Sequence, residues 1–205
     1  MPEAAVEKTD TPEDRVAALA RRAGEKNPRA FEELCGMFSA RVFRMVYFRV
    51  RSKMDAEDLT QEIFMAAFRS MDRLKDPEKF APWLFSIAKN KVADHLRKKK
   101  ITSLFFLNRA REDEAPEEDN APAEGQDALE EVLRREFWEK VDGFTAGLSR
   151  MEKEVFSLRF FSGLGLKEIA QVTKKDESTV KTHLYRAVAK FRDREDLRAF
   201  FKENA

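Results

Sequence analysis

Apolar residues recur every three or four positions along most of this chain, which is the period of a helix with one buried face. Phe31, Phe38 and Val42 belong to one long run of this kind. The pattern predicts an all-α fold. The helices we expect cover residues 15–23, 28–48, 55–74, 78–100, 128–141, 149–161, 166–172 and 177–191.

Polar caps mark several of the expected helix starts. Asp55 is expected to cap its helix, and Asp58 to reach back to free backbone amides at the positive end of the helix dipole. Asn27 stands before Pro28, a residue favoured at the first helical position. Ser149 opens a Ser-x-x-Glu capping box. These signals set the expected boundaries.

Two stretches lack the helical pattern. Residues 1–14 are polar and contain prolines, so we expect a disordered tail. Residues 109–127 are acidic and rich in alanine and proline, which is typical of a flexible linker. We therefore expect two small helical domains, at 15–108 and 128–205, joined by this linker. The apolar run 101–107 has no assigned role.

Charge is sorted along the chain although the totals nearly cancel. There are 39 Lys and Arg against 38 Asp and Glu, a net charge of +1. Every ionisable residue between Glu112 and Glu131 is acidic, whereas residues 89–100 hold six basic residues and only Asp94 as an acid. The near-zero net charge therefore hides one acidic and one basic segment, which we expect to form surfaces of opposite charge.

Composition also excludes several classes of protein. The single cysteine, Cys35, excludes an intrachain disulfide framework and a cysteine-based metal cluster. No stretch approaches the roughly 20 apolar residues of a membrane span, and the polar start does not resemble a signal peptide. We expect a soluble protein of a reducing cytoplasm that needs neither metal nor cofactor.

A polar strip remains on the helix expected at 55–74 once its apolar positions, which include Phe68, are assigned to the buried face. It consists of Asp58, Gln61, Glu62 and Met65. A solvated acidic face would have the same composition, because surface charge is usual on helices. Residue types alone leave both interpretations open.

The helix expected at 78–100 has a basic polar face. Its residues are Lys89, Asn90, Asp94, Arg97 and Lys98. Lysines favour a helix C-terminus because they meet the negative end of the dipole, so a helix stop explains part of this pattern. Six basic residues in twelve exceed that need, and such a face attracts phosphate backbones through counterion release.

The clearest local motif is a helix-turn-helix, with helices at 166–172 and 177–191 and the small Ala170 where they cross. The second helix would expose Glu177, Ser178, Thr179, Lys181, Thr182, Tyr185 and Arg186. Short polar and cationic groups there suit base edges and phosphates of the major groove. An amphipathic helix pair without a DNA role would also have the small crossing residue.

The turn of this motif departs from the usual pattern. Lys174 stands where glycine is common, and Thr173 where an apolar residue is common. A non-glycine residue in a left-handed conformation costs on the order of 1 kcal/mol. We therefore expect a looser or differently shaped turn.

Taken together, the motifs resemble the extracytoplasmic-function (ECF) sigma factors of bacterial RNA polymerase. The family pattern Asp-Ala-Glu-Asp-Leu-x-Gln-Glu-x-Phe is matched by residues 55–64, and Trp-Leu-x-x-Ile-Ala-x-Asn-x-x-x-Asp-x-x-Arg by residues 83–97. Glu-Ile-Ala at 168–170 and Thr-Val-Lys at 179–181 match the second domain. The resemblance covers about residues 16–192.

This resemblance implies roles for named residues. Core polymerase, through the clamp helices of its largest subunit, would bind Asp55, Glu57, Asp58, Gln61, Glu62 and Met65. The minus-ten promoter element, melted, would contact Asp72, Lys75, Lys79, Trp83, Lys89, Asn90, Asp94, Arg97 and Lys98. The minus-thirty-five duplex would be read by the residues exposed on the second helix of the helix-turn-helix. The resemblance further implies a linker that runs through polymerase and an anti-sigma protein that restrains the factor, in some cases at the membrane, with no small-molecule substrate.

Two other functions compete with this one. A stand-alone helix-turn-helix regulator with a helical sensor domain would bind DNA without polymerase, but it has no reason to expose the polar strip. An enzyme acting on nucleic acid would need a catalytic group. His95 and His183 have no metal-ligand partner at useful spacing, and no Gly-rich phosphate loop is present.

Overall fold

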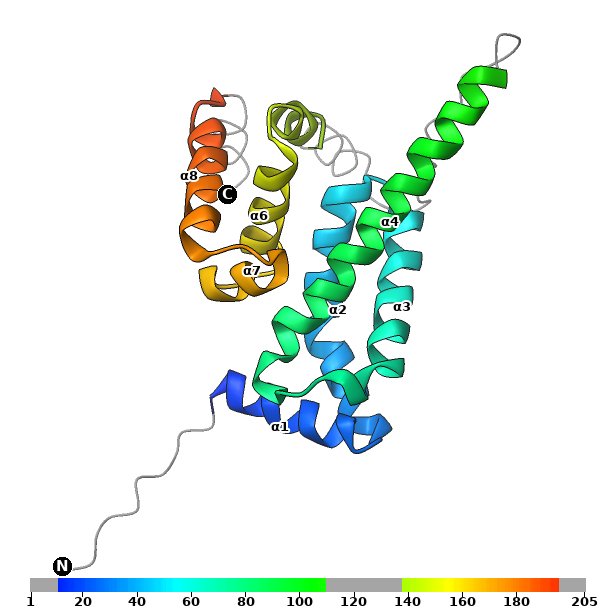
Figure 1. The fold of residues 1–205 in the computed structure, drawn as a ribbon, viewed down its shortest axis with the longest axis vertical. Helices are drawn as coiled ribbons and strands as arrows, with labels where there is room; N and C mark the ends of the chain where they lie inside the picture. The colour runs from blue at the N-terminus through cyan, green and yellow to red at the C-terminus, as the bar shows by residue number, and fades with distance from the viewer. Residues whose placement is uncertain (1–10, 110–137, 196–205) are drawn as a thin grey trace, which may run out of the picture.

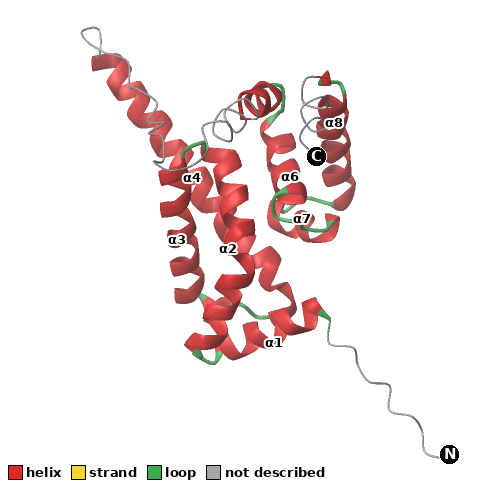
Figure 2. Cartoon of the chain, turned by 180° about the vertical axis from the view of Figure 1, so that it is seen from behind, coloured by secondary structure: helices red, strands yellow, loops and turns green. Residues whose placement is uncertain are grey.

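A computed structural model describes residues 11–109 and 138–195, and every regular element in these ranges is a helix (Figures 1 and 2). The expected all-α fold is confirmed. The expected linker, the first part of the helix expected at 128–141, and residues 1–10 of the expected tail lie outside the described residues.

The first unit, residues 11–109, is built from four α-helices and two short 3-10 turns. These are α1 (Pro12–Gly24), α2 (Pro28–Val50), α3 (Lys53–Arg69), η1 (Met71–Arg73), η2 (Pro77–Lys79) and α4 (Phe80–Arg109). Figure 1 shows α2, α3 and α4 side by side, with α1 crossing below their lower end. Phe80, Leu84 and Ile63 are fully buried between these helices.

Several boundaries differ from those expected. Helix α1 starts before Arg15, because Thr11 and Asp14 form a reciprocal capping box. Ser52, not Asp55, caps α3, and its side chain accepts from the Asp55 amide. Helix α4 does not stop near Lys100 but continues through the apolar run 101–107. The Asn27 cap and Pro28 start of α2 are confirmed.

The second unit, residues 138–195, begins with a helical stretch at 138–146. It continues with α6 (Arg150–Phe160), α7 (Leu166–Thr173) and α8 (Glu177–Arg192). Ser149 and Glu152 form the expected capping box of α6. Phe144, Phe156 and Phe191 contact one another edge-on or tilted and hold α6 against α8.

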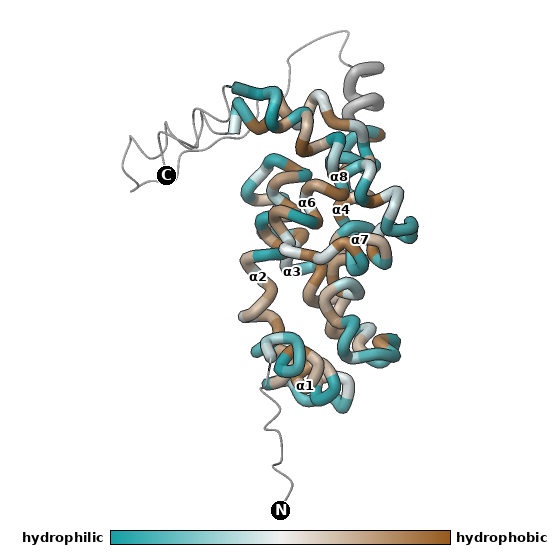
Figure 3. Tube along the Cα trace, turned by 90° about the vertical axis from the view of Figure 1, so that its left-hand side faces the viewer, coloured by the Kyte–Doolittle hydropathy of each residue, from teal (hydrophilic) through white to brown (hydrophobic). Residues whose placement is uncertain are grey.

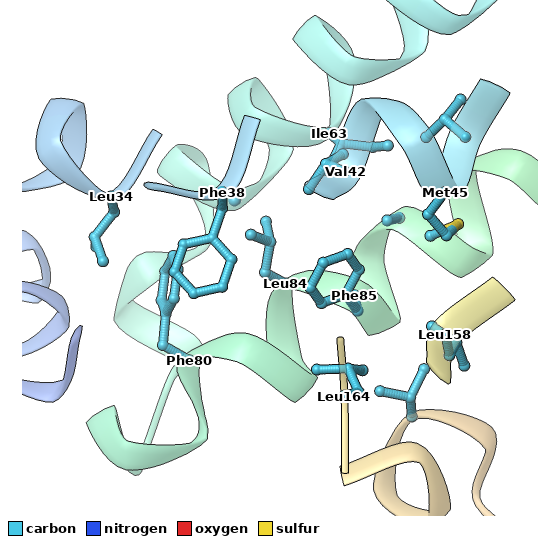
Figure 4. Close-up of a cluster of buried hydrophobic side chains, with 14 of the residues drawn as sticks. Leu34, Phe38, Val42, Met45, Ile63, Phe80, Leu84, Phe85, Leu158 and Leu164 are labelled. Atoms are coloured by element: carbon cyan, nitrogen blue, oxygen red, sulfur yellow. The ribbon is translucent and has the colours of Figure 1, made fainter. Parts of the chain in front are cut away.

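The two units pack directly against each other. Leu158 and Leu164 of the second unit are 1% and 0% exposed and belong to the same buried cluster as Phe85 of the first unit (Figure 4). Hydrophobic and hydrophilic positions alternate along the helical turns (Figure 3), as expected when each helix buries one face. Burying a leucine side chain contributes about 1.5–3 kcal/mol, so this contact is a substantial one.

Candidate polymerase and nucleic-acid interfaces

The acidic strip of α3, formed by Asp58, Gln61, Glu62 and Met65, is exposed as predicted, with Met65 at 52%. Folding uses the opposite face of the helix, where Ala56 and Ile63 are fully buried. Only Glu62 of the strip has a recorded partner in the described part of the chain. It accepts a hydrogen bond from Lys91 of α4 at 2.8 Å, and this bond lowers the pKa of the Glu62 carboxyl.

Asp55 and Glu57 flank this strip on its two edges. The Asp55 carboxylate is 25% exposed and turns toward α4, where it lies 3.4 Å from His95 Nε2 and 3.7 Å from Lys99 Nζ. Asp55 therefore ties α3 to α4. Glu57 is exposed at the edge of the strip nearer α2, beside a shallow hollow that Phe43 and Gln61 of the strip also line between α2 and α3.

The strip has apolar neighbours that the sequence did not assign to it. Phe68 was expected in the buried face, but it is 52% exposed, and its ring lies tilted against the Phe31 ring with centroids 5.1 Å apart. Met54 is 64% exposed. Met54, Met65 and Phe68 share the helix face of Asp58 and Gln61, because they are separated by steps of three, four or seven residues. The helical period counted from Met65 is the signal that identifies them.

A second hollow lies beside the loop between α3 and α4. It is lined by residues 73–76, by Lys79, Pro82, Trp83 and Ser86, and by Gln171 of the second unit. Three residues predicted for the minus-ten element, Lys75, Lys79 and Trp83, thus come together. Asp72 is exposed on the adjoining turn η1 but does not line the hollow. Asp76 caps η2, and the hydrogen bond from Lys79 lowers the pKa of its carboxyl.

The basic face of α4 is divided by the fold. Asn90, Asp94, Arg97 and Lys98 are exposed. Arg97 donates to Asp94 at 3.0 Å, a pairing between neighbouring turns that leaves both side chains in solvent. Lys89 lies elsewhere: its ammonium donates to the Val172 carbonyl of α7 at 2.7 Å, with only 20% of the side chain exposed. The structure therefore separates Lys89 from the residues predicted to act with it.

The helix-turn-helix is formed by α7 and α8, as predicted. Lys174 adopts the left-handed conformation with φ 55° and ψ 42°, and the Lys175 amide bonds back to the Ala170 carbonyl. The turn thus has the ordinary shape of a helix C-cap, and the expectation of a looser turn is wrong. Thr173 is accommodated because its buried hydroxyl donates to the Ile169 carbonyl at 2.7 Å.

Helix α8 presents most of its predicted residues to solvent. Ser178, Lys181, Thr182, Tyr185 and Arg186 are exposed, while Glu177 and Thr179 are partly buried. Asp176 caps the helix and accepts from Ser178 and from the Thr179 amide. These hydrogen bonds, with the Ser178 hydroxyl first, hold the pKa of Asp176 well below its usual range. Ser178 and Thr179 are thereby oriented by the cap.

The two histidines lie in different parts of the described residues. His95 lies beside Asp55 between α3 and α4, and His183 is half-buried on α8. The described ranges contain no cluster of three His, Cys, Asp or Glu residues that would hold a metal ion. Within the same ranges no helix has the length and apolar character required to cross a membrane.

Known families and relatives match both units of the chain. Residues 34–101 match the family described as Sigma-70 region 2, and residues 139–191 match the family described as Sigma-70, region 4. The ECF RNA polymerase sigma factor BldN of Streptomyces coelicolor is 33% identical over 184 residues, which cover 87% of this chain and 65% of BldN. A probable RNA polymerase sigma factor of Haemophilus influenzae is 34% identical over 143 residues, 64% of this chain and 72% of that protein.

A solved structure of CnrH in complex with the cytosolic domain of CnrY has the same fold. It superimposes with a TM-score of 0.64 at 24% identity, covering 94% of this chain and 100% of that one. The matched families, together with the two relatives, determine the class of protein. The chain belongs to the sigma-70 family of RNA polymerase sigma factors, in its ECF group.

Proposed function

We propose that this sigma factor binds core RNA polymerase through the acidic strip of α3 and directs it to promoters. The observation that carries the proposal is that the strip remains exposed after α3 has met its packing needs on the opposite face. Met54, Met65 and Phe68 add apolar area beside Asp58 and Glu62. An apolar contact flanked by charges suits a protein partner better than solvent alone.

The hollow beside Trp83 suits a base of the melted minus-ten strand. An aromatic ring and the cationic Lys75 and Lys79 line it. A base taken from the stack loses a few kcal/mol of stacking and pairing, which ring contacts and nearby phosphate contacts offset. The exposed Asn90, Arg97 and Lys98 continue the cationic path along α4.

Helix α8 is proposed to read the minus-thirty-five element as duplex. Lys181 and Arg186 are exposed on α8, with no hydrogen bond or ion pair recorded among the described residues. Asp176 caps the start of α8. Groove-reading helices make their base contacts near this end. We also propose that residues 15–108 and 128–205 act as separate promoter-reading domains, with 109–127 as the linker through polymerase.

The remaining assignments follow from the same function. The chain has no catalytic activity of its own and acts in the cytoplasm, where polymerase is found. An anti-sigma protein is a proposed partner: CnrH, which shares the fold, was solved with the cytosolic domain of a second protein. Stand-alone DNA regulation is less well supported, because it leaves the acidic strip of α3 without a role.

Transcription reconstituted from purified protein, core polymerase and a promoter library tests the proposal. We expect a discrete set of start sites that disappears when the protein is omitted. Selection of specific DNA by the protein alone, with no start site in the presence of core polymerase, would support the stand-alone regulator instead.

A further inference from the structure

A row of charged side chains joins α3 to α4 beside the two proposed surfaces of the first unit. Lys91, His95 and Lys99 of α4 follow one another at intervals of four residues, so they share one side of the helix. Lys91 donates to the Glu62 carboxylate of α3 at 2.8 Å. His95 and Lys99 lie 3.4 and 3.7 Å from the Asp55 carboxylate. This row, which we call the α3–α4 seam, therefore holds one carboxylate of the acidic strip.

Glu62 has a place in both the seam and the acidic strip. Its side chain stays 56% exposed while it accepts the hydrogen bond from Lys91. That bond is the largest cause of the lowered pKa of the Glu62 carboxyl, and the positive charge of Lys98 adds to it. The carboxylate is therefore ionised at neutral pH and open to a second cation from outside the protein.

Lys91 borders the basic face of α4 in the same way. It follows Asn90 in the chain and precedes Lys98 by seven residues, or two helical turns, so Lys91 and Lys98 share one edge of the helix. Asn90 and Lys98 are exposed residues of the proposed minus-ten surface. The Lys91 side chain is 37% exposed and is drawn toward α3 by Glu62. Because a lysine ammonium sits on a flexible four-carbon stem, it can reach acceptors on either side of this edge.

The ion pair between Lys91 and Glu62 is weak enough to be exchanged. Exposed ion pairs of this kind shift an equilibrium by no more than about fivefold, because water and salt screen both charges. A partner that binds the acidic strip brings cations of its own, and a cation placed at Glu62 competes with Lys91. A displaced Lys91 ammonium then has the phosphates of DNA on the neighbouring face as its acceptors. The nearby pair between Arg97 and Asp94 differs, because both of its members belong to the minus-ten surface.

We propose that Lys91 exchanges partners when the promoter is bound: it pairs with Glu62 in the free sigma factor, and with a DNA phosphate at the minus-ten surface once polymerase has taken Glu62. The proposal rests on the function proposed above. In the free protein Lys91 is a positioning residue that acts through Glu62, and in the promoter complex it is a DNA contact. Polymerase and promoter DNA thereby bind cooperatively, because each ligand frees the group that the other one needs.

The affinity of the full-length protein for core polymerase, in the absence of DNA, tests the first half of the exchange. Lys91→Met removes the competitor for Glu62 and should tighten binding about threefold. Lys91→Arg keeps the charge and should stay near the wild type. Arg15→Met breaks an exposed ion pair with Glu33, at 3.5 Å between α1 and α2, and is the matched control that should bind as the wild type does.

A double-mutant cycle separates the ion pair from a general effect of charge. In a Glu62→Gln background, which should itself weaken binding, Lys91→Met should bring no gain. A gain that persists in this background would refute competition for Glu62. Unchanged affinity of Lys91→Met, beside weakened binding of Asp58→Lys/Glu62→Lys, would overturn the exchange and leave the docking surface standing. Normal affinity of that charge-reversed variant would instead remove the docking surface, and the exchange with it.

The salt dependence of promoter binding tests the second half of the exchange. With core polymerase and a promoter fragment found by the reconstituted transcription, Lys91→Met should weaken DNA binding about threefold. The slope of log affinity against log salt should become shallower by about 0.7–0.9, the range for one lost phosphate contact on a single strand or a duplex. Arg15→Met should keep the wild-type slope. An unchanged slope and affinity in Lys91→Met would overturn the transfer of Lys91 to DNA.

Discussion

The acidic strip of α3 and the basic face of α4 lie on neighbouring helices, but they differ in how much of each stays exposed after folding. Of the acidic strip on α3, only Glu62 is engaged within the described residues, by Lys91 at the surface, while Asp58, Gln61 and Met65 face solvent. On α4, Lys89 binds the second unit and only the far part of the face is exposed. The comparison shows that a polar helix face becomes a candidate binding surface only after contacts from distant parts of the chain are accounted for.

The largest effect is expected from substitutions in the acidic strip of α3, the more exposed of the two faces compared. Reversing charge in Asp58→Lys/Glu62→Lys should weaken binding to core polymerase by about 100-fold, or about 2.7 kcal/mol, because two attractive charges become repulsive. Fluorescence titration with core polymerase measures the affinity. Glu25→Lys, an exposed acid beyond α1, is the matched control and should bind normally. Equal affinity of both variants would remove the strip from the interface.

A smaller effect is expected on the DNA side. Lys181→Ala/Arg186→Ala should weaken binding to minus-thirty-five duplex about tenfold, because two exposed cations no longer displace counterions. The slope of log affinity against log salt should become shallower by about 1.8, or about 0.9 for each lost phosphate contact. Arg21→Ala on α1 should keep the wild-type slope. A slope that stays steep in the α8 variant would place the contacts elsewhere.

The turn of the helix-turn-helix offers a stability test. Lys174→Gly should raise the free energy of unfolding by about 1 kcal/mol, because glycine adopts φ 55° without the clash of a β-carbon. Denaturant titration followed by circular dichroism measures this change. Lys175→Gly is the control: its φ is not positive, and it should bring no gain. Loss of stability in Lys174→Gly would show that the lysine side chain matters to the turn.

The smallest effect concerns pH. The folded-state pKa of Asp176 lies below the ordinary 3.8, so the hydrogen bonds of its ionised form contribute stability above that value and lose it as pH falls further. Asp176→Asn should therefore make stability less dependent on pH below about 4. Thermal unfolding of both proteins between about pH 3 and 5 measures the difference. Identical pH profiles would contradict the role given to the cap.

Local sequence signals predicted the helices well because each depends on neighbours along the chain. The apolar period places α2, α6, α7 and α8 within a few residues of their observed ends. The predicted helix starts were wrong where two possible cap residues compete, as Ser52 and Asp55 do before α3. The start of α1 was missed because its cap, Thr11, precedes few apolar residues.

The binding surfaces were only partly predictable for a different reason. The exposed acidic strip follows from the helical period alone. The contact of Lys89 with Val172 joins residues 83 positions apart, and no local pattern encodes it. Phe68 was misplaced because an aromatic residue at the edge of an apolar face has the same period whether it is buried or half-exposed.

Site-specific photo-crosslinking from position 65 of α3 tests the central claim most directly. A photoreactive residue replacing Met65, in full-length protein mixed with core polymerase and promoter DNA, should crosslink to the largest polymerase subunit. The same residue at exposed position 33 of α2 serves as the reference and should give little product. Crosslinking from position 33 but not from position 65 would contradict polymerase docking at the acidic strip.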